Sequence, residues 1–242
     1  MNTQKKPFDL LVNRHLDVPT PHPEFALLSP DGNTLLITIQ KNASSFVWKW
    51  ALENNWSSRK TESTNPKYLA VILREPIGRW KSAIVQFLYQ LLVRQQGYTD
   101  EKLEQEWSGI VTSLIKSGPA FFDIHTWPQH YWRTTFLPTT PRMYFKFEDH
   151  LNFTLARTFD WNTPSNEINV VGPGFGNVGK TNLEKIKLTN LVEDMLEKDP
   201  GFMLKLQEVF KEDIEIYNSV DFTTKILTRQ DLREGVSYDD YK

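Results

Sequence analysis

Two apolar runs, each ending at a basic residue, constrain the fold of this 242-residue chain more than any other feature. The first, residues 35–39, is aliphatic or β-branched throughout, which is typical of a strand buried on both sides. Lys41 follows it, and apolar residues then recur at helical spacing, so we expect a helix with Ser44 or Ser45 as its N-cap. A cation beside a helix N-terminus is a geometry that holds phosphate or sulfate. An ordinary turn with a solvated lysine explains this stretch equally well.

The second run, residues 68–73, also predicts a doubly buried strand, and it ends at Arg74. Pro76 is suited to the first turn of a helix. The apolar stripe of that helix comprises Ile77, Trp80, Ile84, Phe87, Leu88 and Leu91. This arrangement lets Arg74 and Ser82 converge on one anion. The same sequence is also expected if the arginine only caps the edge of the sheet and the serine only packs within the helix. Two such turns strengthen the case, because open α/β sheets bind ligands at the carboxyl ends of their strands.

The remaining segments complete the expected fold. Residues 24–29 and 34–39 flank a turn signal, Pro30-Asp31-Gly32-Asn33, which predicts a β-hairpin. Residues 54–66 are predicted to be a polar loop, residues 1–24 an irregular lead-in, and residues 221–242 a peripheral polar tail. Two helices are expected in the last third. Their apolar stripes are Leu183, Ile186, Leu191 and Met195 in the first, and Phe202, Leu206, Val209, Phe210 and Tyr217 in the second, which starts near Asp199.

The composition excludes several classes of protein. A hydrophobic content of 39% with 24% charged residues is that of a globular domain, neither disordered nor membrane-spanning. The chain has no cysteine, which excludes disulfides and thiolate metal sites. Its net charge of −2 provides no general attraction to nucleic acid or to an anionic membrane, and we expect neither as a partner. With no signal peptide or transmembrane segment evident, we expect a cytoplasmic or otherwise soluble intracellular protein.

Four motifs, in order along residues 33–220, support a family resemblance. Residues 41–45 have the form Lys-x-x-x-[Ser/Thr], and residues 74–82 have the form Arg-x-Pro-x-x-Arg-x-x-Ser. A histidine precedes a Pro-Gln pair in residues 123–129, and an aromatic-Glu-Asp triplet occupies residues 147–149. On these motifs the chain resembles the PAPS-dependent sulfotransferases, especially a soluble member of the carbohydrate-modifying, Golgi-type branch. It departs from that pattern at Gln40, where many members carry proline, and it lacks the membrane anchor and cysteines common in the Golgi members.

The resemblance implies a fold and a reaction. The implied fold is an α/β, three-layer, P-loop-like single domain over residues 1–242, with a short, mainly parallel sheet flanked by helices and a helical C-terminal part. The implied reaction is the in-line transfer of a sulfonyl group from PAPS to the hydroxyl of an acceptor, by resemblance a carbohydrate, with PAP as product and no metal. The acceptor's identity and the oligomeric state are left open. His125 and His130 are five residues apart with no clustered carboxylate, which makes a poor metal-ligand set.

The resemblance also assigns roles to residues. His125 is the general base, since imidazole titrates near neutrality, although a loop histidine bonded to the backbone fits the same sequence. Glu148 is a second candidate for the base, although an acid at the end of a strand is as often structural. The catalytic pair is His125 and Lys41. The PAPS-binding residues are Lys41, Asn42, Ala43, Ser44, Ser45, Phe46, Arg74, Ser82 and Lys180. The acceptor-binding residues are Gln129, Trp127, Trp132 and Glu148.

Two other functions compete with sulfonyl transfer. Residues 174–181 match the P-loop pattern GxxxxGK[ST], and Thr181 with Glu184 forms a capping box, so a P-loop NTPase or kinase is one alternative. No later strand ends in an aspartate that would hold magnesium, so an NTPase would need a permuted order of elements. The other alternative is a non-catalytic glycan-binding module on the same fold, in which Trp127, Tyr131 and Trp132 stack on a sugar.

Overall fold

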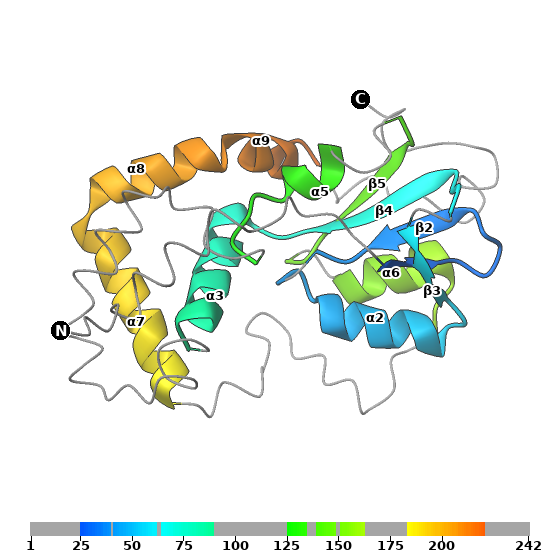
Figure 1. Ribbon diagram of the computed structural model, residues 1–242, viewed down its shortest axis with the longest axis horizontal. Coiled ribbons are helices and arrows are strands. Elements are labelled where there is room, and N and C mark those ends of the chain that lie inside the picture. Colours follow the sequence, from blue (N-terminus) through cyan, green and yellow to red (C-terminus); the bar gives the residue numbers. More distant parts are fainter. Residues whose placement is uncertain are drawn as a thin grey trace, which may run out of the picture. The chain divides into compact units, whose positions relative to one another are not determined.

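The computed structural model describes residues 25–39, 41–61, 64–89, 125–134, 139–148, 151–162 and 183–220, and shows an α/β protein (Figure 1). The predicted lead-in and tail lie outside these residues. The chain divides into two compact units. The helical unit comprises Met1–Pro21, Pro76–Pro128 and Asn177–Glu212, and the sheet unit comprises His22–Glu75, Gln129–Gly176 and Asp213–Lys242.

The sheet unit is built on a five-stranded sheet in the order β3-β1-β2-β4-β5. Strands β2 (Thr34–Ile37), β4 (Tyr68–Leu73) and β5 (Arg142–Lys146) are parallel neighbours. Strand β1 (Phe25–Leu28) pairs antiparallel with both β2 and β3 (Ser57–Lys60). The sheet is therefore mixed, whereas a mainly parallel sheet was predicted.

The β1–β2 hairpin confirms the prediction made from its turn. Gly32 adopts a φ of 73°, a left-handed conformation that glycine reaches without steric cost. The predicted polar loop at 54–66 is wrong in its central part, because β3 forms there and pairs with β1 along the whole of that strand. Ser58, Arg59 and Lys60 are exposed, so β3 is held by backbone hydrogen bonds and carries none of the apolar alternation that identifies a strand.

Both predicted buried strands are confirmed. All described positions of β2 and all six residues of β4 are buried, and Leu35, Leu36, Leu69 and Ala70 have no exposed surface. The parallel pairing aligns Ile37 with Val71 and Leu73 with Lys146. The segments that follow these strands, beginning near Thr38, Arg74 and Phe147, therefore emerge at one edge of the sheet.

Two helices, α2 (Ser44–Glu53) and α6 (Leu151–Phe159), lie alongside each other on one face of the sheet (Figure 1). The rings of Trp50 and Trp161 pack edge to face between them with centroids 4.8 Å apart. Each helix ends at a residue in the left-handed conformation followed by a tryptophan: Asn55 (φ 65°) before Trp56, and Asp160 (φ 55°) before Trp161. In both, the tryptophan amide donates to a carbonyl five residues earlier, the Schellman pattern of helix termination.

The helical unit contains α3 (Pro76–Leu88), which packs along α7 (Leu183–Lys198), and α8 (Pro200–Val209), which follows α7 (Figure 1). The predicted start of α3 at Pro76 is confirmed, and Trp80 on α3 contacts Phe202 with ring centroids 5.8 Å apart. Asp199 caps α8 by accepting from the Phe202 amide. The α7 stripe was partly wrong. Leu183 and Ile186 are 70% and 43% exposed, and the buried positions are Leu188, Val192, Met195 and Leu196.

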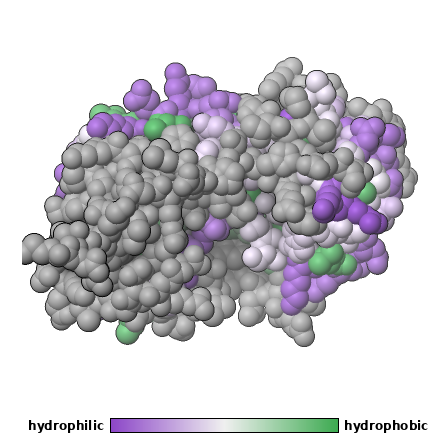
Figure 2. Space-filling model, in the orientation of Figure 1, coloured by the Kyte–Doolittle hydropathy of each residue, from purple (hydrophilic) through white to green (hydrophobic). Residues whose placement is uncertain are grey.

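Two short helices complete the described elements: α5 (His130–Thr134), and α9 (Lys211–Ser219), whose residues from Asp213 on belong to the sheet unit. On the face drawn in Figure 2, the described surface is mainly hydrophilic, with apolar residues in small separate spots. Among the described residues, the large exposed apolar side chains are Leu52, Phe153, Leu183, Ile186 and Leu204. Among the described helices, none has both the length and the apolar character needed to cross a bilayer.

Candidate functional site

The turn after β2 holds two residues in an unusual backbone conformation. Lys41 (φ 70°) and Ala43 (φ 59°) are both left-handed, which costs a residue other than glycine about 1–3 kcal/mol. Between them, Asn42 is fully buried, and its Nδ2 donates to the Ile72 carbonyl and to Gln129 Oε1, both at 2.6 Å. These bonds hold the turn against β4. Asn42 was predicted to bind PAPS, but its side chain points into the sheet unit and stabilises the turn.

Helix α2 begins directly after this turn. Its N-cap is Ala43, so the prediction of Ser44 or Ser45 is wrong: the left-handed turn ends one residue earlier and brings Ser44 into the first helical turn. The Val47 amide donates to the Ala43 carbonyl at 2.9 Å and is the first amide satisfied within the helix. The amides of Ser44, Ser45 and Phe46 therefore have no acceptor inside the helix. Together with the helix dipole, they suit an anion.

Arg74, which follows β4, contacts the same turn. Its Nη1 donates to the Lys41 carbonyl at 3.0 Å, and its guanidinium lies 4.9 Å from the Phe147 ring centroid. Its Nε is 3.8 Å from Glu148 Oε1. Burial lowers the pKa of Arg74, while the charges of Glu148 and Glu75 oppose that shift. The fold thus places two predicted PAPS-binding residues, Lys41 and Arg74, at the carboxyl ends of neighbouring parallel strands.

Gln129 is the centre of the hydrogen-bond network behind the turn. It is 3% exposed, and its Oε1 accepts from Asn42 Nδ2 and from the Arg74 amide at 3.0 Å. Its Nε2 donates to the Arg74 carbonyl at 2.8 Å. All these side-chain bonds are internal to the sheet unit. Gln129 was predicted to contact the acceptor, and the structure gives it a positioning role instead, joining the turn of Lys41 to the backbone of Arg74.

Asp213, a buried carboxylate on α9, anchors this network and was not predicted from the sequence. It accepts from the amides of Gln129 and His130, the latter at 2.7 Å, and lies 3.0 Å from His130 Nδ1. When Nδ1 carries the proton and donates to Asp213, Nε2 of His130 can accept a proton, which is the arrangement of a general base. No local signal identifies this pair, because 83 residues separate its members.

Glu148 is tied to its surroundings by three groups. It accepts from the Glu75 amide at 3.2 and 3.3 Å and from the Tyr217 hydroxyl at 2.9 Å, and it lies beside Arg74. Lys146 Nζ lies 4.5 Å from the Tyr217 ring centroid. These contacts fit a structural role for Glu148 at the end of a strand, the alternative to its being the general base. Its side chain is nevertheless 39% exposed at this edge of the sheet.

The other predicted residues are distributed between the two units. His125 lies half-buried in a turn of the helical unit, and Ser82 lies on α3 of the same unit, so their roles stay predictions. Arg79 of the second motif is fully buried and its Nη1 donates to the Trp127 carbonyl at 2.6 Å, which fixes the segment that carries His125. Trp132 in the sheet unit is only 2% exposed, so the prediction that it stacks on a sugar is wrong.

Several predictions fall on residues that the structure does not describe. Lys180 and the P-loop-like residues 174–181 lie outside the described residues, as does Asp149. Within the residues that are described, no three His, Asp or Glu side chains gather in the manner of a metal site.

Comparisons with known proteins identify no relative of this chain. No protein-family model matches it, and neither a curated protein nor a solved structure shows significant similarity to it. The candidate site therefore has to be judged on its chemistry. It combines the N–H groups of a helix start, a lysine, a partly buried arginine and a carboxylate-bound histidine. Such a set can bind an anion, stabilise negative charge on a leaving group and move a proton.

Proposed function

We propose that the protein is a PAPS-dependent sulfotransferase that transfers a sulfonyl group to a hydroxyl of a carbohydrate acceptor. The observation that carries this proposal is the hydrogen bond from Arg74 Nη1 to the Lys41 carbonyl. It joins the predicted 5′-phosphosulfate turn to the first residue of the predicted 3′-phosphate motif. The proposal includes the finer description of the fold, a three-layer P-loop-like domain.

The donor groups of the site suit a ligand with two separate phosphates. The first-turn amides of α2 and the Lys41 ammonium suit one of them. Arg74 suits the other: Nη1 is engaged with Lys41 and Nε faces Glu148, while Nη2 makes no hydrogen bond to any described residue. PAPS, when bound, supplies the sulfonyl group and a phosphate leaving group. Arg74 would recognise the 3′-phosphate, which distinguishes PAPS from adenosine 5′-phosphosulfate, and the part of Ser82 in that recognition is implied by the resemblance alone.

In this proposal, each step of an in-line displacement is assigned to a different residue of the chain. Lys41 neutralises the negative charge that develops on the leaving phosphate oxygen. His125 removes the proton of the acceptor hydroxyl in the assignment made by resemblance. His130, oriented by Asp213, is the competing base, and it lies in the same unit as Lys41. Gln129 and Asn42 keep the turn in its left-handed conformation and do not contact the reacting atoms.

Calorimetric titration with PAP and ADP tests the donor site. We expect wild-type protein to bind PAP more tightly than ADP. Arg74→Ala should weaken PAP binding about 10- to 100-fold, because a hydrogen bond to a charged group contributes about 1.5–3 kcal/mol. Arg157→Ala, at an exposed position of α6, is the matched control and should leave binding unchanged. Equal affinities for PAP and ADP in the wild-type protein would refute the 3′-phosphate site.

Turnover tests the chemistry. With PAPS and a panel of glycan acceptors, we expect Lys41→Ala to abolish sulfonyl transfer while circular dichroism stays native. His125→Ala and His130→Ala, compared over a range of pH, identify the base: its loss removes the ionisation seen on the acid side of the pH–rate profile. If both variants keep the wild-type profile, a histidine base is wrong.

The same titration distinguishes the two alternatives. Magnesium-dependent binding of ATP or GTP that is lost in Lys180→Ala, with PAP no better than ADP, would assign a P-loop NTPase. Binding of glycans with no affinity for PAP or PAPS would assign a non-catalytic module. The P-loop alternative does not use the bond between Arg74 and the Lys41 turn, and a non-catalytic module has no use for the catalytic pair His125 and Lys41, which is why we rank both below sulfonyl transfer.

A further inference from the structure

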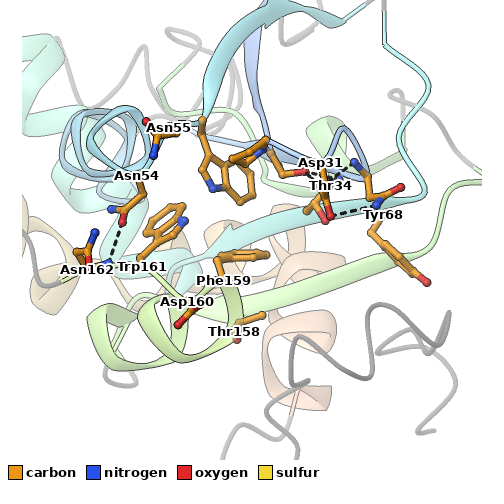
Figure 3. A pocket seen from close by; sticks show the side chains of 14 residues that line it. Asp31, Thr34, Asn54, Asn55, Tyr68, Thr158, Phe159, Asp160, Trp161 and Asn162 are labelled. Carbon is orange, nitrogen blue, oxygen red and sulfur yellow. Dashed lines mark hydrogen bonds between the residues drawn. The ribbon is translucent and has the colours of Figure 1, made fainter.

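A second candidate site lies in the sheet unit, at the amino ends of β2 and β4. A pocket of about 230 Å³ opens there between the β1–β2 turn and the ends of α2 and α6 (Figure 3). Thr34 and Tyr68, the first residues of β2 and β4, line it. Lys41 and Arg74 follow the opposite ends of these strands, so this pocket is separate from the proposed donor site and does not depend on it.

Aromatic rings form one wall of the pocket. Trp56 packs edge to face against Phe159, with centroids 4.9 Å apart at 70°, and against Trp161, at 5.4 Å and 89°. Figure 3 shows Phe159 and Trp161 side by side, with Asn54 and Asn162 beyond one end and Asp31, Thr34 and Tyr68 beyond the other. The pocket thus combines an apolar surface with polar groups on two sides, which is the make-up of a small-molecule site.

The charged side chains that line this pocket are two carboxylates, those of Asp31 and Asp160. Among the described residues that line it, none is Lys, Arg or His, so nothing attracts an anion. Asp31 is already occupied within its turn. Its Oδ1 accepts from Ser29 Oγ at 2.6 Å and from the Asn33 amide at 3.1 Å, and its Oδ2 accepts from Asn33 Nδ2 at 3.0 Å. This carboxylate therefore stabilises the turn and offers little to a cation.

Apart from the exposed carboxylate of Asp160, which can accept from a hydroxyl, the groups that remain to bind a ligand are neutral. The exposed side-chain amides of Asn55 and Asn162 make no hydrogen bond within the described part of the chain. Thr158 Oγ1 and Trp161 Nε1 are buried and lack a partner among the described residues. Amides and hydroxyls both donate and accept, as the hydroxyls of a ligand do. The indole N–H of Trp161 only donates, so it favours a ligand group with a lone pair, such as a hydroxyl, over an ammonium, which has none.

The positions of these groups are set in advance by the backbone. Asn55 occupies the left-handed position after α2, and Asn162 follows the equivalent turn after α6. The Asn162 amide donates to Asn54 Oδ1 at 2.8 Å, and its carbonyl accepts from Trp50 Nε1 at 2.7 Å. Both Asn162 bonds use backbone atoms, so its side chain stays available to a ligand. A preformed site of this kind loses little conformational entropy on binding.

We propose that this pocket binds one neutral sugar unit of a glycan. The aromatic wall packs against the C–H groups of the sugar, and Asn55, Asn162 and Trp161 exchange hydrogen bonds with its hydroxyls. The volume of about 230 Å³ lies below the roughly 300–1,000 Å³ of sites for drug-sized ligands, which suits a single ring.

Indole NMR resonances test this proposal directly. The ¹⁵N-labelled protein has eight tryptophans, and Trp161→Phe assigns the indole signal of Trp161. The probes are the methyl glycosides of glucose, galactose, mannose and N-acetylglucosamine, with choline chloride and sodium sulfate for comparison. We expect at least one glycoside to shift the Trp161 signal saturably, in the millimolar range, and neither salt to shift it.

Side-chain variants then locate the binding. Asn162→Ala should weaken glycoside binding at least tenfold while its backbone bonds persist. Asn55→Gly keeps the left-handed backbone and should weaken binding too. Asn190→Ala, at an exposed position of α7, is the matched control. The proposal is overturned if no glycoside shifts the Trp161 signal, if Asn162→Ala and Asn55→Gly bind like wild type, or if choline or sulfate binds in place of the glycosides.

Discussion

Replacing Gln129 by leucine is the most informative perturbation of the candidate site, because one buried side chain holds the Lys41 turn to the Arg74 backbone. Leucine has a similar size but can neither donate nor accept. The change removes the bonds from Asn42 Nδ2 and the Arg74 amide to Oε1, and the bond from Nε2 to the Arg74 carbonyl. Asn42 Nδ2 keeps the Ile72 carbonyl, whereas both backbone groups of Arg74 lose their partner.

The size of the effect follows from these contacts. Each hydrogen bond contributes about 0.5–1.5 kcal/mol net, so the lost set is worth about 3 kcal/mol. An energy of that size corresponds to a change of about 100-fold in an equilibrium constant. We therefore expect the free energy of unfolding of the sheet unit to fall by about 3 kcal/mol.

Hydrogen exchange measures this loss at the atom concerned. The Arg74 amide donates to Gln129 Oε1, so its protection should fall about 100-fold in Gln129→Leu, and the urea midpoint of unfolding should fall in parallel. Gln207→Leu, the same change at an exposed position of α8, should stay within about 0.5 kcal/mol of wild type. A Gln129→Leu protein with an Arg74 amide as protected as in wild type would refute the role given to Gln129.

Two further changes test the neighbouring elements. Asp213→Asn leaves one acceptor oxygen where two now accept from the amides of Gln129 and His130, so it should lower the free energy of unfolding by about 1–2 kcal/mol in urea titration. The control, Asp194→Asn, loses only an exposed ion pair with Lys198 and should lower it by less than about 0.5 kcal/mol. Ala43→Gly relieves the left-handed strain before α2 and should raise the free energy of unfolding, measured by thermal unfolding, by about 0.5–1 kcal/mol. Ala156→Gly within α6 should lower it by about 1 kcal/mol. If both glycine variants change the free energy of unfolding in the same direction, the strain assigned to Ala43 is wrong.

The sequence predicted the elements whose stability is local. The hairpin turn at Gly32, the doubly buried strands β2 and β4, and the start of α3 at Pro76 each have a signal within a few residues. The ends of these strands bring Lys41 and Arg74 together, as their positions predicted. Strand β3 was missed because its polar side chains are exposed and its stability comes from backbone bonds to β1.

The hydrogen-bond network behind the site could not be predicted from local sequence patterns. Gln129 binds groups 87 and 55 residues away, and Asp213 lies 84 residues from Gln129. No periodicity or spacing encodes such pairs, since they form only when distant segments have folded. The same holds for Trp132, whose burial in the fold removes it from the sugar-stacking role that its neighbours in the sequence suggested.

The tryptophans at the ends of α2 and α6 have a consequence for spectroscopy. The ring of Trp161 lies 4.8 Å from that of Trp50 and 5.4 Å from that of Trp56, both at steep angles, close enough for their excited states to couple. Coupled indoles of fixed geometry produce a strong near-ultraviolet circular dichroism signal that disappears when the rings separate. Trp80, which packs on Phe202, belongs to the helical unit. The signal of the coupled tryptophans therefore provides an intrinsic optical reporter of the sheet unit, through which its unfolding can be followed without any added label.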